Sequence, residues 1–107
     1  MNLLFICSRN QWRSPTAETI FRRHPSIQVR SAGTSPNARR TVSAADIVWA
    51  DKILVMEEKH QSRLRATFAR ALQHKTLIVL DITDDYRYMD AELVELLKSA
   101  VAPHLPA

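Results

Sequence analysis

Cysteine and glycine are nearly absent from this chain of 107 residues, which contains one of each, Cys7 and Gly33. A single thiol excludes an internal disulfide and a cysteine-rich metal site. Long hydrophobic runs are missing too, because none approaches the roughly 18 residues that a membrane-spanning helix needs. The apolar start, Leu3–Ile6, is too short for the core of a signal peptide and lacks a basic segment before it. We therefore expect a cytoplasmic protein that does not associate with membranes.

The sequence also lacks an internal repeat, a low-complexity tract and a linker, so we expect one domain spanning residues 1–107. Hydrophobic residues make up 46%, which is enough for a packed core in a chain of this length. The net charge of +4 favours an anionic partner: a phosphate ester, an acidic protein or a nucleic acid. The basic residues are scattered, with no stripe of alternating basic and aromatic residues, and this argues against a nucleic acid.

Apolar runs alternate with amphipathic stretches about four times along the chain. This alternation predicts an α/β three-layer sandwich, with a roughly four-stranded parallel sheet and helices on both faces. We expect the strand order 2-1-3-4, which would place Cys7, at the end of the first strand, centrally in the sheet. The expected strands are Leu3–Ile6, Ser26–Arg30 (at an edge), Ile53–Met56 and Leu77–Leu80. Four helices are expected: the first has its N-cap at Ser14, the second carries an apolar stripe of Val42, Ala45, Val48 and Trp49, the third spans Glu57–His74, and the fourth begins at a cap on Asp90. The expected loops are Ser31–Arg40 and Asp81–Tyr88.

The candidate catalytic residues lie between Cys7 and Ser14. Cys7 directly follows the first strand, and Arg13 directly precedes the Ser-Pro start of a helix. A loop over a helix N-terminus directs backbone N–H groups inward and binds an anion such as inorganic phosphate or another oxyanion. The planar guanidinium of Arg13 can hold two phosphate oxygens, and its charge would favour the thiolate of Cys7. The sequence thus predicts a Cys7 nucleophile under a phosphate bound by Ser8, Arg9, Asn10, Gln11, Trp12, Arg13 and Ser14.

The alternative interpretation is a buried structural cysteine beside a solvated pair of arginines, Arg9 and Arg13. Cysteine and arginine occur at this spacing often by chance. A buried cysteine would, however, leave unexplained why the pair falls between the end of an apolar strand and the start of a helix, which is the setting that a phosphate-binding loop requires.

This segment resembles the opening of the low-molecular-weight protein tyrosine phosphatase family, a strand followed by Cys-x5-Arg-Ser, including the loop asparagine at Asn10. Two later segments, Ser31–Thr34 and Asp51–Met56, also resemble the family, and the resemblance covers about three quarters of the chain. It implies hydrolysis of an aryl phosphate, on a phosphorylated protein or a small molecule, through a phosphocysteine and without metal or cofactor. Under this resemblance Cys7 is the nucleophile, Arg13 the phosphate clamp, Ser14 the thiolate stabiliser and Asn10 the residue that holds the loop's shape.

The chain departs from the family pattern in length and within the loop. It is about a third shorter than typical members, mostly between Thr34 and Asp51, where the family has walls of its substrate cleft. We therefore expect a shallower or differently built cleft. Trp12 replaces a second loop cysteine that many members have. Arg9 replaces a common glycine, and its side chain could either contact phosphate or point to solvent.

The general acid is marked less clearly than the nucleophile. The family uses the Asp of an Asp-Pro-Tyr segment after its last strand, and this chain has Asp81-Ile82-Thr83-Asp84-Asp85-Tyr86 there. Asp84 matches the spacing to the tyrosine but lacks the proline, whereas Asp81 lies nearer the end of the strand. We favour Asp84, with Asp81 as the alternative; either could instead cap a helix or face solvent. Tyr86, and also Tyr88, could form a wall of the cleft for an aryl group, or could serve in packing.

Three rival functions share the predicted fold. Arsenate reductases with a similar loop need further cysteines, which this chain lacks, and phosphocarrier domains typically lack the arginine. A non-catalytic module that binds phosphate or a phosphoprotein remains the main alternative, because the middle of the chain is short and the acid is unclear. The histidines show no metal-ligand spacing and are expected at the surface or in packing; they are His24, His60, His74 and His104.

Overall fold

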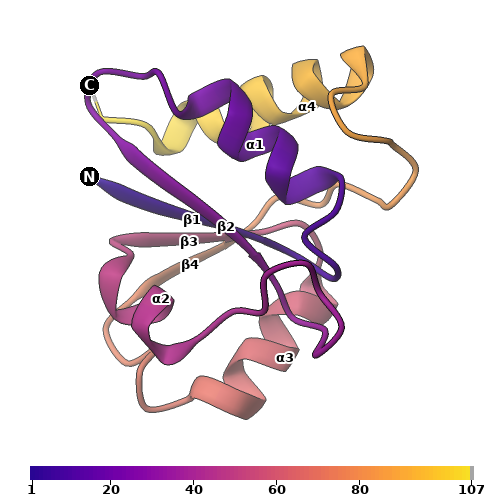
Figure 1. The fold of residues 1–107 in the computed structure, drawn as a ribbon. Helices are drawn as coiled ribbons and strands as arrows, with labels where there is room; N and C mark the ends of the chain where they lie inside the picture. Colours follow the sequence, from indigo (N-terminus) through magenta and orange to yellow (C-terminus); the bar gives the residue numbers. More distant parts are fainter. Residues whose placement is uncertain (107) are drawn as a thin grey trace.

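The computed structural model describes residues 1–106 and has one parallel sheet of order β2-β1-β3-β4, as predicted. Helices α1 and α4 cover one face of the sheet, and α2 and α3 cover the other (Figure 1). Within this range no helix is both long and apolar enough to cross a bilayer. The elements in chain order are β1 (Asn2–Cys7), α1 (Arg13–Phe21), β2 (Gln28–Gly33), α2 (Ala44–Trp49), β3 (Lys52–Val55), α3 (Glu58–Phe68), β4 (Thr76–Val79), α4 (Ala91–Val101) and a 3-10 turn, Ala102–His104.

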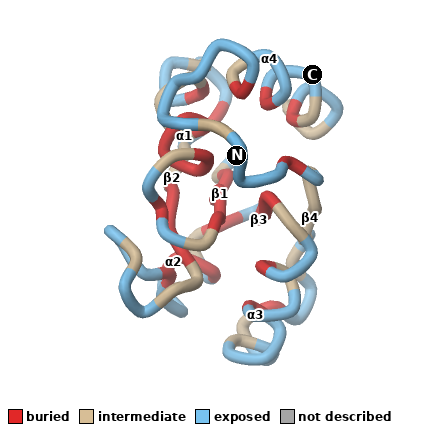
Figure 2. Tube along the Cα trace, turned by 90° about the vertical axis from the view of Figure 1, so that its right-hand side faces the viewer, coloured by how far each residue is buried: buried red, intermediate tan, exposed pale blue. Residues whose placement is uncertain are grey.

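Strand β1 is buried on both faces, which explains its unbroken apolar sequence. Leu3 and Phe5 pack into the core that α1 and α4 share with the sheet. Leu4 and Ile6, which alternate with them, pack into the second core on the side of α2 and α3. The burial colours show β1 as mostly buried and β4, at the edge of the sheet, as intermediate, with exposed residues on the outer sides of the helices (Figure 2). Two cores therefore fix the position of β1 from opposite sides.

This position of β1 places Cys7 in the middle of the sheet's carboxyl edge. β1 pairs in parallel with β2 on one side and with β3 on the other, and Cys7 aligns with Gly33 of β2. The chain runs from β1 to β2 on one side and later to β3 and β4 on the other, so the strand order reverses at β1. Such reversal points are where open α/β sheets bind ligands.

The second strand lies further along the chain than the sequence predicts. The expected strand was Ser26–Arg30, but β2 spans Gln28–Gly33, so the loop begins at Thr34 instead of Ser31. Residues 31–33 pair with residues 5–7 of β1. Their side chains are small or absent, and they pack closely without the alternation of polar and apolar residues by which a strand is identified.

The first helix begins differently from the prediction. Ser14 is not the N-cap: it lies inside α1, and Trp12 occupies the cap position without any side-chain hydrogen bond to the helix. Ser14 instead directs its hydroxyl toward Cys7. The first N–H groups of α1 thus have no side-chain cap and remain available at the end of the helix that faces the loop.

Two further helix predictions need correction. The stripe predicted around α2 is half right: Val42 and Trp49 pack in the core as expected, but Ala45 and Val48 are exposed, and Ile47 is buried instead. A capping box between Ser43 and Asp46 sets the start of this six-residue helix and turns Ile47 inward. Helix α3 ends at Phe68, well before the predicted His74, and turns follow it. The last helix begins as predicted, because the side chain of Asp90 accepts a hydrogen bond from the N–H of Glu92.

Candidate active site

The loop between β1 and α1 turns its carbonyl groups outward and leaves its N–H groups free. The carbonyls of Cys7, Ser8 and Arg9 accept hydrogen bonds of 2.9 to 3.0 Å from N–H groups in the segment 34–39. In the described chain, the backbone hydrogen bonds of turns and loops include none that is donated by an N–H group of residues 8–13. Buried N–H groups need an acceptor, and a concave row of them is a binding site for an anion.

Asn10 holds this loop in its curved shape. Its φ of 54° is in the left-handed region, which asparagine adopts more readily than most residues and which bends the chain into a nest. The buried side-chain amide donates to the hydroxyls of Ser14, at 3.0 Å, and Ser31, at 2.9 Å. Ser31 donates in turn to Glu18 at 2.6 Å. The loop's curvature is thus tied to both α1 and β2.

Cys7 lies at the base of the loop beside a hydroxyl group. Its Sγ is 3.0 Å from Oγ of Ser14, and both residues are buried. Because Asn10 already donates to this oxygen, the hydroxyl hydrogen of Ser14 is left to donate elsewhere. The other acceptor in reach, the carbonyl of Ala32, is 3.5 Å away, so the sulfur is the nearer partner. A hydroxyl that donates to sulfur stabilises a thiolate.

The guanidinium of Arg13 is fixed by three groups from other parts of the chain. Nη1 donates to a carboxylate oxygen of Glu57 at 2.6 Å and to the carbonyl of Ile82 at 2.8 Å. Nε lies 3.5 Å from Oδ1 of Asp84. Arg13 itself is only 2% exposed, so its orientation is set by these partners rather than by solvent. A guanidinium held in one position keeps its fork ready for an oxyanion.

Glu57 remains charged beside this arginine. Burial alone would raise the pKa of its carboxyl, but the hydrogen bond and charge of Arg13 outweigh burial and lower the pKa below its usual 4.5. Lys59, whose ammonium is 3.7 Å from the same carboxylate oxygen, contributes in the same direction. The ion pair of Glu57 and Arg13 is therefore present throughout the neutral pH range.

His60 supports the loop from the opposite wall and is almost fully buried. Its Nδ1 accepts the backbone N–H of Glu57 at 3.0 Å, so the ring hydrogen is on Nε2. Nε2 then donates to Oγ of Ser8, 2.8 Å away, and the hydroxyl hydrogen of Ser8 is left for another acceptor. Burial, followed by the charge of Arg13, lowers the pKa of His60 to about 4. At neutral pH the ring is therefore an uncharged donor.

The loop, Arg13 and one of the candidate acids enclose a hollow of about 270 Å³. Asp84 lines this hollow beside the predicted nucleophile. Asp81 is not among the lining residues. It is exposed, and its backbone has a positive φ of 56°. Tyr86 packs against the core cluster rather than the hollow. The residues that line the hollow are Cys7, Ser8, Arg9, Gln11, Trp12, Arg13 and Asp84.

Gly33 permits the loop to lie directly on β2. A Cβ atom at this position would be 2.5 Å from the carbonyl oxygen of Ser8 and 2.6 Å from Cβ of Ala38. Real carbon atoms do not approach backbone oxygen so closely, so any side chain would displace the loop. The chain's only glycine is required here for space rather than for an unusual φ, because no glycine has a positive φ.

Three groups of this site were not identified from the sequence: Glu57, His60 and the carbonyl of Ile82. His60 was expected in a surface or packing role. One signal was available, because Glu57 and His60 follow β3, a neighbour of β1, and their polar side chains lie near the carboxyl edge that holds Cys7. A backbone carbonyl such as that of Ile82 leaves no signal in the sequence.

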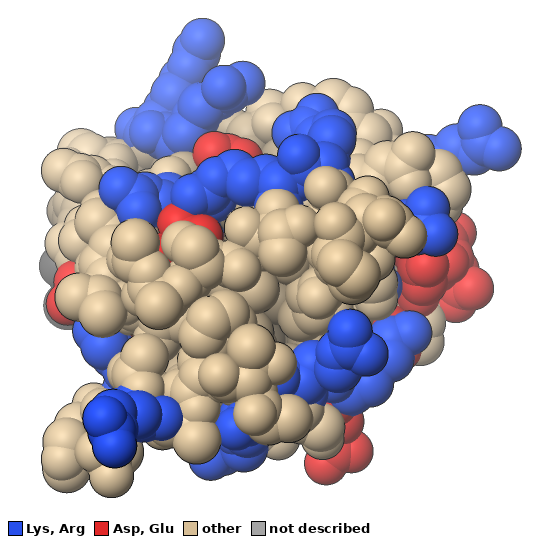
Figure 3. All heavy atoms as spheres, turned by 60° about the horizontal axis from the view of Figure 1, so that its bottom comes forward, with Lys and Arg blue, Asp and Glu red and all other residues tan. Residues whose placement is uncertain are grey.

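Charged side chains are dispersed over one face of the molecule. On the face that Figure 3 shows, Lys and Arg side chains form several separate groups divided by uncharged surface. Within residues 1–106, no three His, Cys, Asp or Glu side chains gather as they would around a metal ion.

Solved structures share this fold along nearly their whole length. The tyrosine phosphatase Wzb from Escherichia coli K30, in complex with phosphate, gives a TM-score of 0.79 at 23% identity and covers 96% of this chain and 94% of its own. The YwlE arginine phosphatase from Geobacillus stearothermophilus gives a TM-score of 0.72 at 20% identity and covers 99% of this chain and 98% of its own. Identities this low demonstrate a common fold and leave the reaction open.

Sequence comparisons establish the family. A protein-arginine-phosphatase of Bacillus subtilis (strain 168) is 29% identical over 97 residues, with 65% of this chain and 65% of the relative covered. The chain therefore spans slightly less than two thirds of that curated relative. The family model of the low molecular weight phosphotyrosine protein phosphatases matches residues 2–82, a range that includes the whole sheet and the loop from Cys7 to Ser14. This chain belongs to the low molecular weight phosphotyrosine protein phosphatase family.

Proposed function

We propose that this chain hydrolyses phosphate monoesters through Cys7, with phosphotyrosine as the substrate group. The observation that supports this is one hollow that contains a thiol beside a hydroxyl donor, a row of free N–H groups, a fixed guanidinium and a carboxyl group. These are the groups that attack phosphorus, stabilise negative charge and supply a proton.

In the proposed first step, the thiolate of Cys7 attacks the phosphorus and the bond from phosphorus to the aryl oxygen breaks. Arg13 and the free N–H groups of the loop hold the three other phosphate oxygens, where negative charge accumulates. Asp84, at the mouth of the same hollow, donates a proton to the departing oxygen. The products are a phosphocysteine on Cys7 and a neutral phenol.

In the second step a water molecule attacks the phosphocysteine. The carboxylate of Asp84 takes one proton from the water, and the bond between phosphorus and sulfur breaks to regenerate the thiolate. The hydroxyl of Ser14, 3.0 Å from Sγ, stabilises that thiolate as leaving group. Inorganic phosphate remains on the loop and then dissociates, so the reaction consumes one water and restores every group on the protein.

Aromatic residues beside the loop support phosphotyrosine over an alkyl phosphate. Trp12 lines both the hollow over Cys7 and a neighbouring one that Tyr88 borders. The hydroxyl of Tyr88 lies 2.8 Å from that of Thr19 on α1, which anchors its ring. Aromatic rings in and beside this hollow would favour an aryl group by stacking. Protein phosphoarginine is the second candidate, favoured by the similarity to the protein-arginine-phosphatase of Bacillus subtilis.

The first experiment measures hydrolysis of p-nitrophenyl phosphate by the wild type, Cys7→Ser and Arg13→Lys. We expect turnover in the wild type that persists in EDTA, no turnover in Cys7→Ser, and a large loss in Arg13→Lys, because an ammonium cannot replace the planar fork. Vanadate should inhibit the wild type competitively. Full activity in Cys7→Ser would refute the mechanism, and phosphate binding without turnover in the wild type would identify a binding module instead.

The second experiment decides the substrate group. Matched peptides that contain phosphotyrosine, phosphoarginine or phosphoserine are compared by kcat/KM at one pH. A ratio that favours phosphotyrosine supports our proposal. A ratio that favours phosphoarginine would leave the role proposed for Cys7 unchanged and would identify phosphoarginine as the substrate group.

A further inference from the structure

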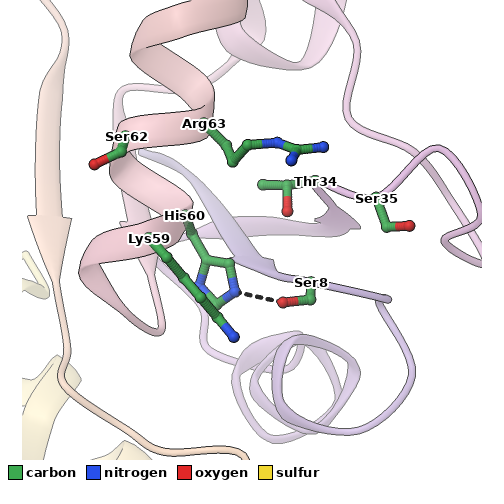
Figure 4. Close-up of a pocket in the computed structure, with 7 residues that line it drawn as sticks. All are labelled: Ser8, Thr34, Ser35, Lys59, His60, Ser62 and Arg63. Atoms are coloured by element: carbon green, nitrogen blue, oxygen red, sulfur yellow. Dashed lines mark hydrogen bonds between the residues drawn. The ribbon is translucent and has the colours of Figure 1, made fainter.

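A second hollow of about 600 Å³ lies next to the one that contains Cys7. Ser8 lines both, so the two hollows meet at the phosphate-binding loop. In Figure 4, Arg63 extends from α3 across the top of this hollow toward Thr34, while Ser8 and His60 form its lower wall. The hollow is thus positioned to receive the part of a substrate that follows the group bound over Cys7.

The residues that line this second hollow include cations and hydroxyl groups but no carboxylate. Lys59 and Arg63 are four residues apart on α3 and so lie on the same side of the helix. Within the described chain Arg63 has no ion pair, and Lys59 is linked only to Glu57, at 3.7 Å. The hollows on the other side of the loop differ, because Glu18 lines both of them.

The neutral state of His60 matters for the charge of this hollow. Because its ring is an uncharged donor to Ser8, the positive charge comes from Lys59 and Arg63 alone. Both cations are exposed residues of α3, and the hydroxyl of Thr34, which lies between Arg63 and Ser8, can also donate. An anionic group in this position would meet hydroxyl donors and two positive charges, of which Arg63 is unpaired within the described chain and Lys59 is shared with Glu57 outside the lining.

We propose that this second hollow is a specificity subsite for an anionic group of the substrate, a carboxylate or a second phosphate beside the target phosphate. This proposal rests on the proposed function, since it concerns which residue stands next to the phosphorylated residue in the substrate. Arg63 is the principal specificity residue, and Lys59 assists it. The chain then prefers phosphopeptides with an acidic or phosphorylated neighbour over those with a neutral or basic one.

The test uses phosphopeptides that differ at one position flanking the phosphorylated residue, with Glu, phosphoserine, Gln or Lys placed on either side in turn. Each kcat/KM is divided by the same enzyme's value for p-nitrophenyl phosphate, so that a general loss of activity cancels. For the wild type we expect Glu and phosphoserine to exceed Gln by about 2- to 5-fold on one side, the upper part of the range for exposed ion pairs, and we expect Lys to be lowest. A higher kcat/KM for the phosphoserine peptide alone, without one for the Glu peptide, would show that the subsite binds a phosphate group and not a carboxylate.

Charge reversal provides the decisive comparison. Arg63→Glu should reverse the order, so that the Lys peptide is best, and Lys59→Gln should weaken the preference. Arg65→Glu is the matched control, because Arg65 is an exposed arginine of the same helix that does not line the hollow, and it should keep the wild-type order. Dissociation constants measured with Cys7→Ser test the same order without catalysis, so an inactive wild type would refute only the proposed function. Equal values for the Glu, Gln and Lys peptides would refute the subsite.

Discussion

At the scale of single residues, the position of Arg13 depends on Glu57, whose carboxylate lies 2.6 Å from Nη1. We predict that Glu57→Ala lowers kcat/KM for p-nitrophenyl phosphate by about 10- to 100-fold, because a clamp displaced by about 1 Å loses its alignment with the phosphate. Steady-state kinetics at pH 7 provide the measurement. Glu58→Ala is the matched control, since Glu58 is the next residue, is exposed and has no ion pair with Arg13. Equal losses in both variants would show that α3, and not the ion pair, is responsible.

The two candidate acids, Asp84 and Asp81, are separated by a second prediction. Asp84→Asn should lower turnover of a substrate with a poor leaving group by about 10²- to 10⁴-fold. The loss should be much smaller for p-nitrophenyl phosphate, whose leaving group scarcely needs a proton. Asp81→Asn should have little effect on either, because Asp81 does not line the hollow. The reverse order would assign the acid to Asp81, and two unaffected variants would exclude both.

Most residues of the candidate site that could be predicted belong to one short segment, and Asp84, which also lines the hollow, was named through its resemblance to the family's spacing. Cys7, Asn10, Arg13 and Ser14 belong to one strand–loop–helix unit, and their spacing sets their relations in space. The partners of Arg13 come from 44 and 69 residues away along the chain, and only tertiary folding brings them near. A motif search along the sequence therefore finds the groups that would touch phosphate and misses those that orient them.

At the scale of elements, the contact between β2 and the loop depends on Gly33. We predict that Gly33→Ala weakens inhibition by phosphate and destabilises the fold by about 1 to 3 kcal/mol, because the added carbon would displace the loop or the strand. Phosphate inhibition and urea unfolding provide the two measurements. The double variant with Ala38→Gly removes one of the clashes but leaves the 2.5 Å approach to the carbonyl of Ser8. It should therefore remain impaired, and full recovery would contradict this account.

The attachment of α3 to the loop through His60 gives a prediction for pH. In the unfolded chain this histidine takes up a proton near pH 6.5, whereas burial keeps it neutral in the fold until about pH 4. Its contribution to stability is therefore fully present above pH 6.5 and is lost as the pH falls toward 4, by about 3 kcal/mol at most. The unfolding free energy of His60→Asn should be lower than that of the wild type at pH 7.5 but should fall less between pH 6.5 and 4.5. Equal slopes would refute this.

Elements were predicted well where side chains are large and poorly where they are small. The core of β1 and the cap of α4 have clear apolar and polar signals, and both were found. The prediction for β2 began two residues early and ended three residues early, because Ser31, Ala32 and Gly33 pair with β1 without large apolar side chains. The stripe of α2 was misplaced because a buried carboxylate, Asp46, occupies an inward position and is held there by Arg30 and Arg40. Periodicity cannot identify a polar residue that is buried because it is paired.

At the scale of the whole molecule, one thiol in 107 residues limits recovery from oxidation. A reactive thiolate is converted by peroxide to a sulfenic acid, which a second thiol can trap as a disulfide. This chain has Trp12 where a second loop cysteine would be, so it has no internal thiol to trap that species. We predict that graded peroxide, without added thiol, causes a loss of activity that dithiothreitol only partly restores. Trp12→Cys should increase the restored fraction. Complete recovery of the wild type at every dose would contradict this.

The solitary cysteine has another consequence, for how the protein can be observed. Any thiol-specific reagent that binds one equivalent per chain has reacted at Cys7, so labelling counts intact nucleophiles directly. The mass of the digested peptide that contains Cys7 likewise reports the cysteine's successive states, since a bound phosphoryl group and added oxygen atoms each change it by a distinct amount, whereas the mass of the whole protein would also count oxygen added to its three methionines. Phosphorylation and oxidation of the site can therefore be followed together in one spectrum of that peptide, with no tag.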